Sequence, residues 1–209
     1  MRYKNYINNE WVDGLDGNKF DIENPFTEEI IAQVPKSSAR DVDVAVQAAK
    51  SAWKNWKTLG SLDMRDLMRE VAVKSRIHDY EIAKIITAES GKPLIECLDE
   101  IEWIASIFEY YSEIGRDQRG RVVAPVTPRS MSMVVKESYG VVGCIVPWNY
   151  PLLLMAWKVA PALAAGNTVV IKPSEITPLS IVVWLEKCCN HLPRGILNMV
   201  TGFGDTGAA

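Results

Sequence analysis

From Gly140 onward, short apolar runs alternate with longer segments of helical length. Three of the runs are continuous and rich in β-branched residues, which is typical of parallel strands covered on both faces. These runs are residues 140–146, 167–172 and 196–200. Residues 151–166 and 177–190 lie between them and are long enough to form crossover helices. The alternation predicts an α/β fold, with an open parallel sheet and flanking helices.

The residues before this alternation follow other patterns. Residues 1–35 combine short apolar stretches with Asp, Gly and Asn turn signals, so we expect strands and hairpins there. A capping-box pair, Ser38 and Asp41, precedes a helical spacing of apolar residues that reaches about residue 57. Three further helical segments follow and end near Gly115. The first half therefore predicts N-terminal strands and then a helical layer.

Residues 121–138 interrupt the helical pattern. Two prolines and several polar residues break up residues 121–130, and apolar and polar positions alternate in residues 131–136. Such alternation suits an exposed or interfacial antiparallel strand, and proline within sheets is confined to edges and bulges. We therefore expect a small antiparallel excursion from the main fold.

Composition narrows the class of protein. The 209 residues are 48% hydrophobic and 23% charged, with a net charge of −3, as in a soluble globular chain. This mild acidity, without a basic cluster, argues against nucleic acid or anionic membrane partners. The sequence also lacks a membrane-spanning apolar run and a signal-peptide core. Four cysteines without CxxC spacing favour a reducing compartment, so we expect a cytoplasmic protein, and we predict no metal site.

Ligands of open α/β sheets bind at the carboxyl ends of the strands. The first predicted strand is followed by Asn149, which lies between Pro147 and Pro151 in a turn that both prolines stiffen. A rigidly held Asn amide can donate a hydrogen bond to a developing oxyanion. The alternative is that Asn149 only caps the helix opening at Pro151.

The second predicted strand ends with Lys172, and Glu175 follows three residues later. A carboxylate at this place in a nucleotide-binding sheet can accept both hydroxyls of an adenosine ribose, and a lysine can donate to the same sugar. The carboxylate also repels a 2′-phosphate, so the pair favours NAD over NADP, with NADP remaining possible. The alternative is a solvated lysine and a glutamate near the start of the next helix.

The third predicted strand leads into a GxGxxG sequence with Gly202, Gly204 and Gly207. Glycines at such a place allow the backbone to approach a phosphate, and a following helix supplies N–H donors. Only two residues follow Gly207, so we expect no helix beyond the motif. The alternative is a turn in which the glycines serve only backbone geometry.

The long block from Val146 to Ser180, together with ESGKP at residues 89–93, closely resembles the aldehyde dehydrogenase superfamily. The resemblance implies a Rossmann-like fold and an enzyme that oxidises an aldehyde to a carboxylic acid with NAD(P). It assigns Asn149 to the oxyanion hole. The implied cofactor-binding residues are Ile145, Val146, Pro147, Trp148, Lys172, Ser174, Glu175 and Gly204.

The resemblance also implies a division of the chain into domains. Residues 1–119 and 139–209 correspond to the NAD(P)-binding domain, which is expected to be incomplete at its C-terminal end. Residues 120–138 correspond to strands that bridge subunits, which implies a homo-oligomer. The resemblance reaches only about the first two fifths of a typical family member, so we expect a truncated chain whose catalytic domain is absent.

The family reaction uses a cysteine nucleophile and a glutamate base, and we expect this chain to lack both. None of the four cysteines matches the nucleophile; they are Cys97, Cys144, Cys188 and Cys189. His78 and His191 are interpreted as surface or capping residues. An alternative to the enzyme is a catalytically dead module that binds a nucleotide or assembles subunits. Light scattering would test assembly.

Overall fold

The computed structural model describes residues 3–117 and 120–209. Its main sheet has five strands in the order β2-β1-β9-β8-β7. The strands β7 (Val141–Ile145), β8 (Thr168–Lys172) and β9 (Leu197–Met199) are parallel. The predicted α/β fold with an open parallel sheet is therefore confirmed.

The N-terminal hairpin completes this sheet, which the sequence did not predict. Strand β1 (Asn5–Ile7) pairs antiparallel with β9 and with β2 (Glu10–Val12). A second hairpin, β3 (Lys19–Glu23) and β4 (Ile30–Pro35), forms a separate two-stranded sheet. The prediction of strands and hairpins in the first 35 residues is thus confirmed.

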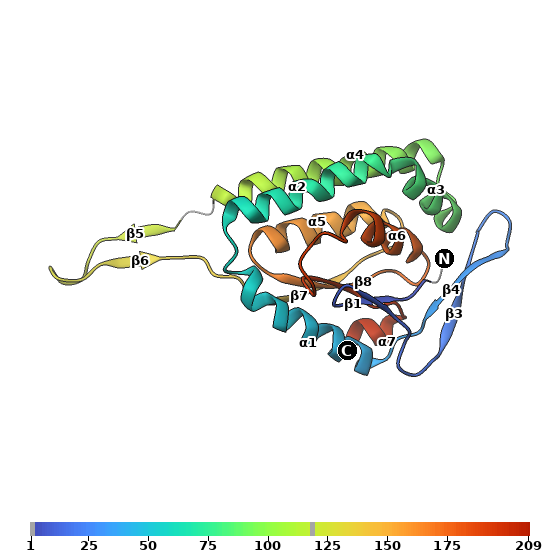
Figure 1. Ribbon diagram of the computed structural model, residues 1–209, viewed down its shortest axis with the longest axis horizontal. Coiled ribbons are helices and arrows are strands. Elements are labelled where there is room, and N and C mark those ends of the chain that lie inside the picture. Colours follow the sequence, from blue (N-terminus) through green and yellow to red (C-terminus); the bar gives the residue numbers. More distant parts are fainter. Residues whose placement is uncertain (1–2, 118–119) are drawn as a thin grey trace.

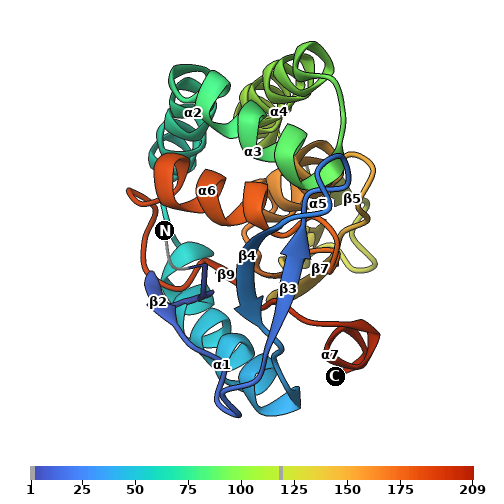
Figure 2. The same ribbon diagram turned by 90° about the vertical axis from the view of Figure 1, so that its right-hand side faces the viewer.

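The helices are arranged in layers around the sheet (Figure 1). Helix α1 (Ala39–Trp56) covers one face, and α5 (Pro151–Ala164) and α6 (Leu179–Cys188) cover the other. Outside α5 and α6 lies a further layer of three helices, α2 (Ser61–Ile77), α3 (Asp79–Ser90) and α4 (Leu94–Ile114). Figure 2 shows the same layers end on. Three of the four helices predicted for the helical layer form it, and this layer reaches the sheet through α5 and α6. The first predicted helix, α1, lies instead on the opposite face of the sheet.

The core joins the outer helices to the crossover helices. Trp184 of α6 is fully buried, and its ring lies 5.6 Å from that of Phe108 of α4. Its indole N–H donates to Ser75 Oγ of α2 at 3.0 Å. Burying a large aromatic side chain while satisfying its donor stabilises a core. Trp184 therefore ties three helices together.

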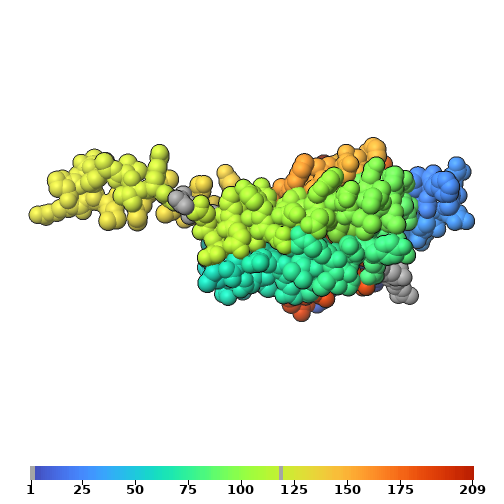
Figure 3. Space-filling model, turned by 90° about the horizontal axis from the view of Figure 1, so that it is seen from above, coloured from blue at the N-terminus to red at the C-terminus, as the bar shows by residue number. Residues whose placement is uncertain are grey.

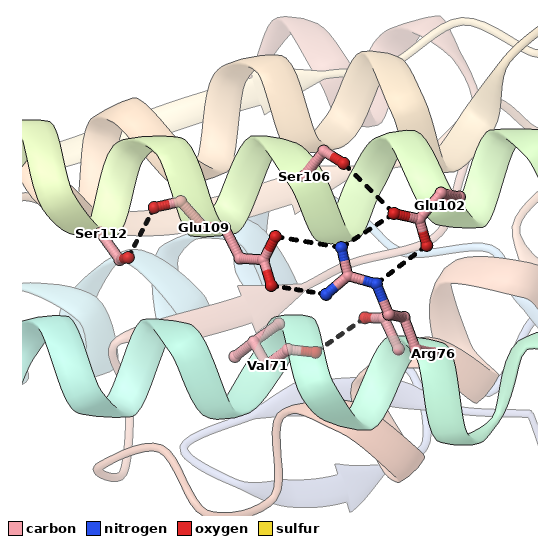
Figure 4. Close-up of polar contacts among 7 residues, drawn as sticks. Val71, Arg76, Glu102, Ser106, Glu109 and Ser112 are labelled. Carbon is pink, nitrogen blue, oxygen red and sulfur yellow. Dashed lines mark hydrogen bonds and ion pairs between the residues drawn. The ribbon is translucent and has the colours of Figure 1, made fainter.

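A charged cluster lies on the outer surface of the helical layer (Figure 4). Arg76 of α2 reaches two glutamates of α4, with its guanidinium 2.8 Å from Glu102 and 2.5 Å from Glu109. These contacts hold the pKa values of both carboxyl groups below their ordinary range. Because all three side chains are partly exposed, solvent screens their attraction. The cluster aligns α2 with α4 at little gain in stability.

A two-stranded hairpin projects from the body of the molecule (Figures 1 and 3). It consists of β5 (Arg121–Val123) and β6 (Ser132–Val134), which pair antiparallel. A 3-10 turn, η1 (Gly115–Asp117), precedes it. The predicted antiparallel excursion is therefore present. The proposed domain limits at residues 1 and 119 lie outside the described residues.

Among the residues that the structure describes, no helix is both long and apolar enough to cross a membrane. The same part of the chain contains no group of three or more potential metal-ligating side chains.

Candidate functional site

The candidate site lies where the three parallel strands end. Ile145 of β7 pairs in register with Lys172 of β8, and Ile171 of β8 pairs with Met199 of β9. The loops that follow the three strands therefore leave the sheet at the same edge, as the sequence predicted.

The loop after β7 is anchored at its base and open at its tip. Val146 is buried, and its N–H donates to the carbonyl oxygen of Lys172 at 3.0 Å. The Thr177 hydroxyl donates to the carbonyl oxygen of Trp148 at 3.4 Å, which links this loop to the loop after β8. Pro147 is exposed, and Ile145 and Trp148 are 59% and 54% exposed. The anchored backbone thus presents apolar side chains to solvent.

Lys172 and Glu175 come together as the sequence suggested. Their Nζ and Oε2 atoms lie 3.3 Å apart, with Lys172 only 8% exposed and Glu175 half-buried. A hydrogen bond from its own backbone N–H, the largest cause, and Lys172 lower the pKa of Glu175, although burial opposes them. Glu175 is therefore an ionised acceptor beside a fixed ammonium group.

Ser174 lies in the turn between Lys172 and Glu175. It is buried, and its Oγ accepts a hydrogen bond from the backbone N–H of Ile176 at 3.3 Å. The hydroxyl thus shapes the turn that presents Glu175.

The glycine-rich loop is held from behind by a buried polar network. Asn5 Oδ1 accepts a hydrogen bond from the Thr201 N–H at 3.0 Å, and the Thr206 hydroxyl donates to the Ser37 carbonyl oxygen at 2.6 Å. Gly202 has a φ of +154°, and a Cβ there would lie 2.2 Å from Thr206 Oγ1. Only glycine fits this close approach.

Gly204 occupies the open side of the same loop. A Cβ at Gly204 would meet no atom within 4 Å, so its backbone is accessible. A five-residue helix, α7 (Gly204–Ala208), begins at this residue. The expectation that the motif has no helix is therefore wrong, because α7 begins within the motif and extends past Gly207 to Ala208.

A depression of about 550 Å³ lies beside the Lys172–Glu175 pair. Trp148, Glu175 and Phe203 line it from the three strand-end loops, and residues of the β3–β4 hairpin close its far side. One of these residues, Phe20, packs against Phe203 with ring centroids 4.7 Å apart. The second hairpin therefore contributes a wall that the sequence analysis did not assign to the site.

Asn149 opens onto a different depression, of about 600 Å³. This one is mainly apolar, and its lining includes Trp103, Tyr150 and Trp157. The N-cap residue of α5 is Tyr150, so the interpretation of Asn149 as the helix cap is wrong. Among the described residues, the exposed Asn149 amide has no hydrogen-bond partner. It is free to donate into the depression.

The four cysteines and His191 lie in packed surroundings that favour a structural role. Every cysteine is free and buried, and burial raises the pKa of Cys144 to about 11 and that of Cys188 to about 12. His191 is half-buried, with its ring 3.0 Å from the Leu67 carbonyl oxygen and 3.1 Å from Lys74 Nζ. It is thus a packed contact between α2 and the segment after α6, not a surface residue.

The sequence analysis missed two buried glutamates behind the loops. Glu89 lies in the last turn of α3 and accepts hydrogen bonds from the backbone N–H groups of Leu179 and Ser180 at 2.6 and 3.0 Å. Glu100 lies in α4 and is fully buried. Charge on the apolar side of a helix is the signal that could have revealed both residues.

Burial makes Glu89 a source of pH-dependent stability. It raises the pKa of Glu89 to about 8, although hydrogen bonds from Ser180 and Leu179 oppose the shift. Between the ordinary value of 4.5 and about 8, folded Glu89 keeps a proton that the unfolded chain has lost. Stability from this group is therefore lost as pH rises through that window.

We expect Glu89→Gln to flatten the alkaline side of the stability profile. From pH 6 to pH 9 the wild-type chain should lose about 2 to 3 kcal/mol more unfolding free energy than the variant. Urea unfolding at both pH values measures this difference. Glu109→Gln is the control, because the pKa of that group is lowered. Parallel profiles for wild type and Glu89→Gln would contradict the assignment.

Comparison with known proteins identifies relatives of the whole chain. Residues 11–209 match the aldehyde dehydrogenase family. The chain is 40% identical to a chloroplastic betaine aldehyde dehydrogenase of Beta vulgaris, over 97% of this chain and 43% of that protein. It is 37% identical to aminoaldehyde dehydrogenase 2 of Zea mays, over 98% of this chain and 42% of the relative.

Solved structures give the same result. A betaine aldehyde dehydrogenase of Staphylococcus aureus, solved with NAD+, matches with a TM-score of 0.94 and 34% identity, over 99% of this chain and 43% of that one. An NADP-dependent enzyme of E. coli matches with a TM-score of 0.95 and 33% identity, over 99% of this chain and 43% of that one. The chain spans less than half the length of these relatives.

Proposed function

The chain belongs to the aldehyde dehydrogenase family, and on this premise we propose that it is the NAD(P)-binding part of an enzyme that oxidises an aldehyde to a carboxylic acid. The observation that carries the proposal is the Lys172–Glu175 pair at the carboxyl end of β8, next to the depression lined by Trp148. In this proposal residues 1–119 and 139–209 form the cofactor domain, and residues 120–138 form the assembly strands.

The residues present fit a dinucleotide. Glu175 is an ionised acceptor and Lys172 a donor, which is the pair that a ribose diol requires. The accessible backbone at Gly204 leaves room for a pyrophosphate, and Ile145 to Trp148 offer an apolar wall. Bound NAD+ would accept the hydride of the aldehyde. Because Glu175 repels a 2′-phosphate, the site favours NAD+ over NADP+.

Asn149 is proposed as the oxyanion donor. Its amide is free among the described residues, and it lies at the edge of the apolar depression where an aldehyde carbonyl could sit. An amide held there stabilises negative charge that develops on the carbonyl oxygen, by about 3 to 4 kcal/mol. Pro147 and Pro151 limit the movement of the loop and so reduce the cost of reorganising it.

The aromatic lining of the same depression favours an aldehyde that carries a cationic group. Trp103, Tyr150 and Trp157 line it, and the faces of aromatic rings attract ammonium groups. The relatives named for betaine aldehyde and for aminoaldehydes support this substrate class.

We propose that the 209 residues alone do not turn over an aldehyde. A cysteine nucleophile must reach solvent as a thiolate, and all four cysteines of the chain are buried. The chain also spans less than half the length of its relatives. We propose that these residues supply neither the cysteine nucleophile nor the glutamate base.

The hairpin β5–β6 and the cysteines bear on assembly and location. The hairpin projects from the body with several exposed apolar side chains, which favours a homo-oligomer. Four free thiols favour a reducing compartment, such as the cytoplasm, although relatives include chloroplastic and peroxisomal proteins.

Calorimetry and absorbance test the proposal on the 209-residue chain. We expect saturable NAD+ binding. We expect no rise in NADH absorbance when betaine aldehyde is added. Absence of binding at millimolar NAD+ would overturn the cofactor assignment. Steady NADH formation would overturn the statement that these residues lack the nucleophile.

A further inference from the structure

Helices α5 and α6 begin directly after the two loops that carry the proposed ligand contacts. Neither start is capped by its own N-cap residue: Tyr150 and Pro178 occupy these positions and make no side-chain capping bond. The first backbone N–H groups of a helix have no partner within the helix, and leaving them buried and unpaired is costly. Other groups must therefore satisfy them.

Glu100 supplies the partner for α5. One oxygen, Oε1, accepts from the N–H groups of Leu152 and Leu153, both at 3.0 Å. The other, Oε2, lies 2.6 Å from Lys92 Nζ. Glu100 is fully buried and comes from α4, about fifty residues earlier in the chain, so this is a long-range contact.

Glu89 supplies the hydrogen-bond acceptors for the start of α6. Its two oxygens accept from the N–H groups of Leu179 and Ser180, the first two residues of that helix. Both glutamates belong to one short stretch, residues 89–100, which we call the α3–α4 junction. Gly91 makes its sharp turn possible, with a φ of +75° and a Cβ position 3.0 Å from Pro25 Cγ.

Lys92 extends the junction to the substrate side. Its Nζ lies 3.7 Å from the centre of the Tyr150 ring, over the ring face. Tyr150 in turn lies next to Asn149 and lines the same apolar depression. A single ammonium group therefore contacts both the carboxylate that holds α5 and the aromatic ring at its start.

We propose that the α3–α4 junction is a positioning device, in which Glu89, Lys92 and Glu100 fix the two loops that carry the ligand contacts. Glu100 and Lys92 set the loop of Trp148 and Asn149, and Glu89 sets the loop of Glu175. They act through the starts of the two helices, because none of them bonds to the proposed contact residues Trp148, Asn149 or Glu175, although Glu89 also lines the depression beside Glu175. The role of the two loops in ligand binding rests on the proposed function. The hydrogen bonds and the ion pair of Glu89, Lys92 and Glu100 do not depend on it.

The test uses the 209-residue chain with Glu100→Ala, Glu100→Gln and Glu109→Ala. Glu100→Ala removes the acceptor, and Glu100→Gln retains one. Glu109→Ala is the matched control, because it also lies in α4 and also loses an ion pair, with Arg76. Two quantities are measured at a temperature where every variant is folded. They are the NAD+ Kd and the 15N indole signal of Trp148, which Trp148→Phe assigns.

We expect Glu100→Ala to raise the Kd about tenfold and to shift the Trp148 signal, with Glu100→Gln within about threefold of wild type. Glu109→Ala should change neither quantity. If Glu100→Ala does not fold, Lys92→Met replaces it and should move both quantities in the same direction. An unmoved Trp148 signal, or equal effects of Glu100→Ala and Glu109→Ala, would overturn the proposal.

The two readouts separate this inference from the proposed function. If wild type does not bind NAD+, the cofactor assignment fails, and the Trp148 signal alone still decides whether the junction positions the loop. A shift confined to Glu100→Ala then supports positioning, and a shift shared with the control overturns it.

Discussion

Glu175→Ala is expected to weaken NAD+ binding by about tenfold or more, and NADP+ binding by less. The carboxylate is ionised, since its pKa is lowered, and it lies beside Lys172 Nζ in position to accept from a ribose diol. Its removal deletes both hydrogen bonds with NAD+, but only the bond from the 3′-hydroxyl with NADP+, whose 2′ oxygen carries the phosphate. For NADP+ it also removes the repulsion between the carboxylate and the 2′-phosphate, so the loss is partly offset.

Calorimetric titration of each variant with both cofactors measures the effect. Glu175→Gln is an informative intermediate variant, because it keeps a hydrogen-bond acceptor and removes the charge. It should therefore narrow the difference between the NAD+ and NADP+ affinities. Asp66→Ala is the control: this exposed carboxylate of α2 pairs with Arg65, and its loss should leave both affinities unchanged. Equal losses of NAD+ and NADP+ affinity in Glu175→Ala would exclude the ribose assignment.

The parallel strands were predictable because their sequences satisfy a single local rule. All five residues of β8 are buried, as a continuous apolar run requires. The same topology rule brings Lys172 and Trp148 to one edge of the sheet, whatever the details of packing. For this reason the candidate cofactor residues could be found without a structure.

The long-range contacts could not be predicted in this way. The pairing of Tyr6 with Met199 joins residues from opposite ends of the chain, and a short hairpin gives no local sign of its partner. Glu89 and Glu100 stand out only as charged residues on the apolar sides of their helices, and the N–H groups that they accept from lie about 50 to 90 residues away. Their role follows from tertiary contacts, which periodicity does not encode.

The β5–β6 hairpin has an apolar surface, and we expect changes to this surface to have a large effect on assembly. Met133 of β6 and Val135, the residue after that strand, are 62% and 66% exposed. They are two residues apart, so an extended chain places them on one face, and Val122 pairs with Met133 across the hairpin. An isolated two-stranded hairpin is marginally stable in water. Its projection from the body suggests that a second copy of the chain covers this face.

The double variant Met133→Lys and Val135→Lys is therefore expected to convert the oligomer fully to monomer. Placing two ammonium groups in an apolar interface costs several kcal/mol, because each must be desolvated without a partner. Light scattering with size-exclusion chromatography measures the mass. The control is Val73→Lys with Ile77→Lys, two exposed apolar residues of α2 on the body of the molecule. A monomeric wild type, or an oligomer that survives the hairpin change, would show that the hairpin does not hold subunits together.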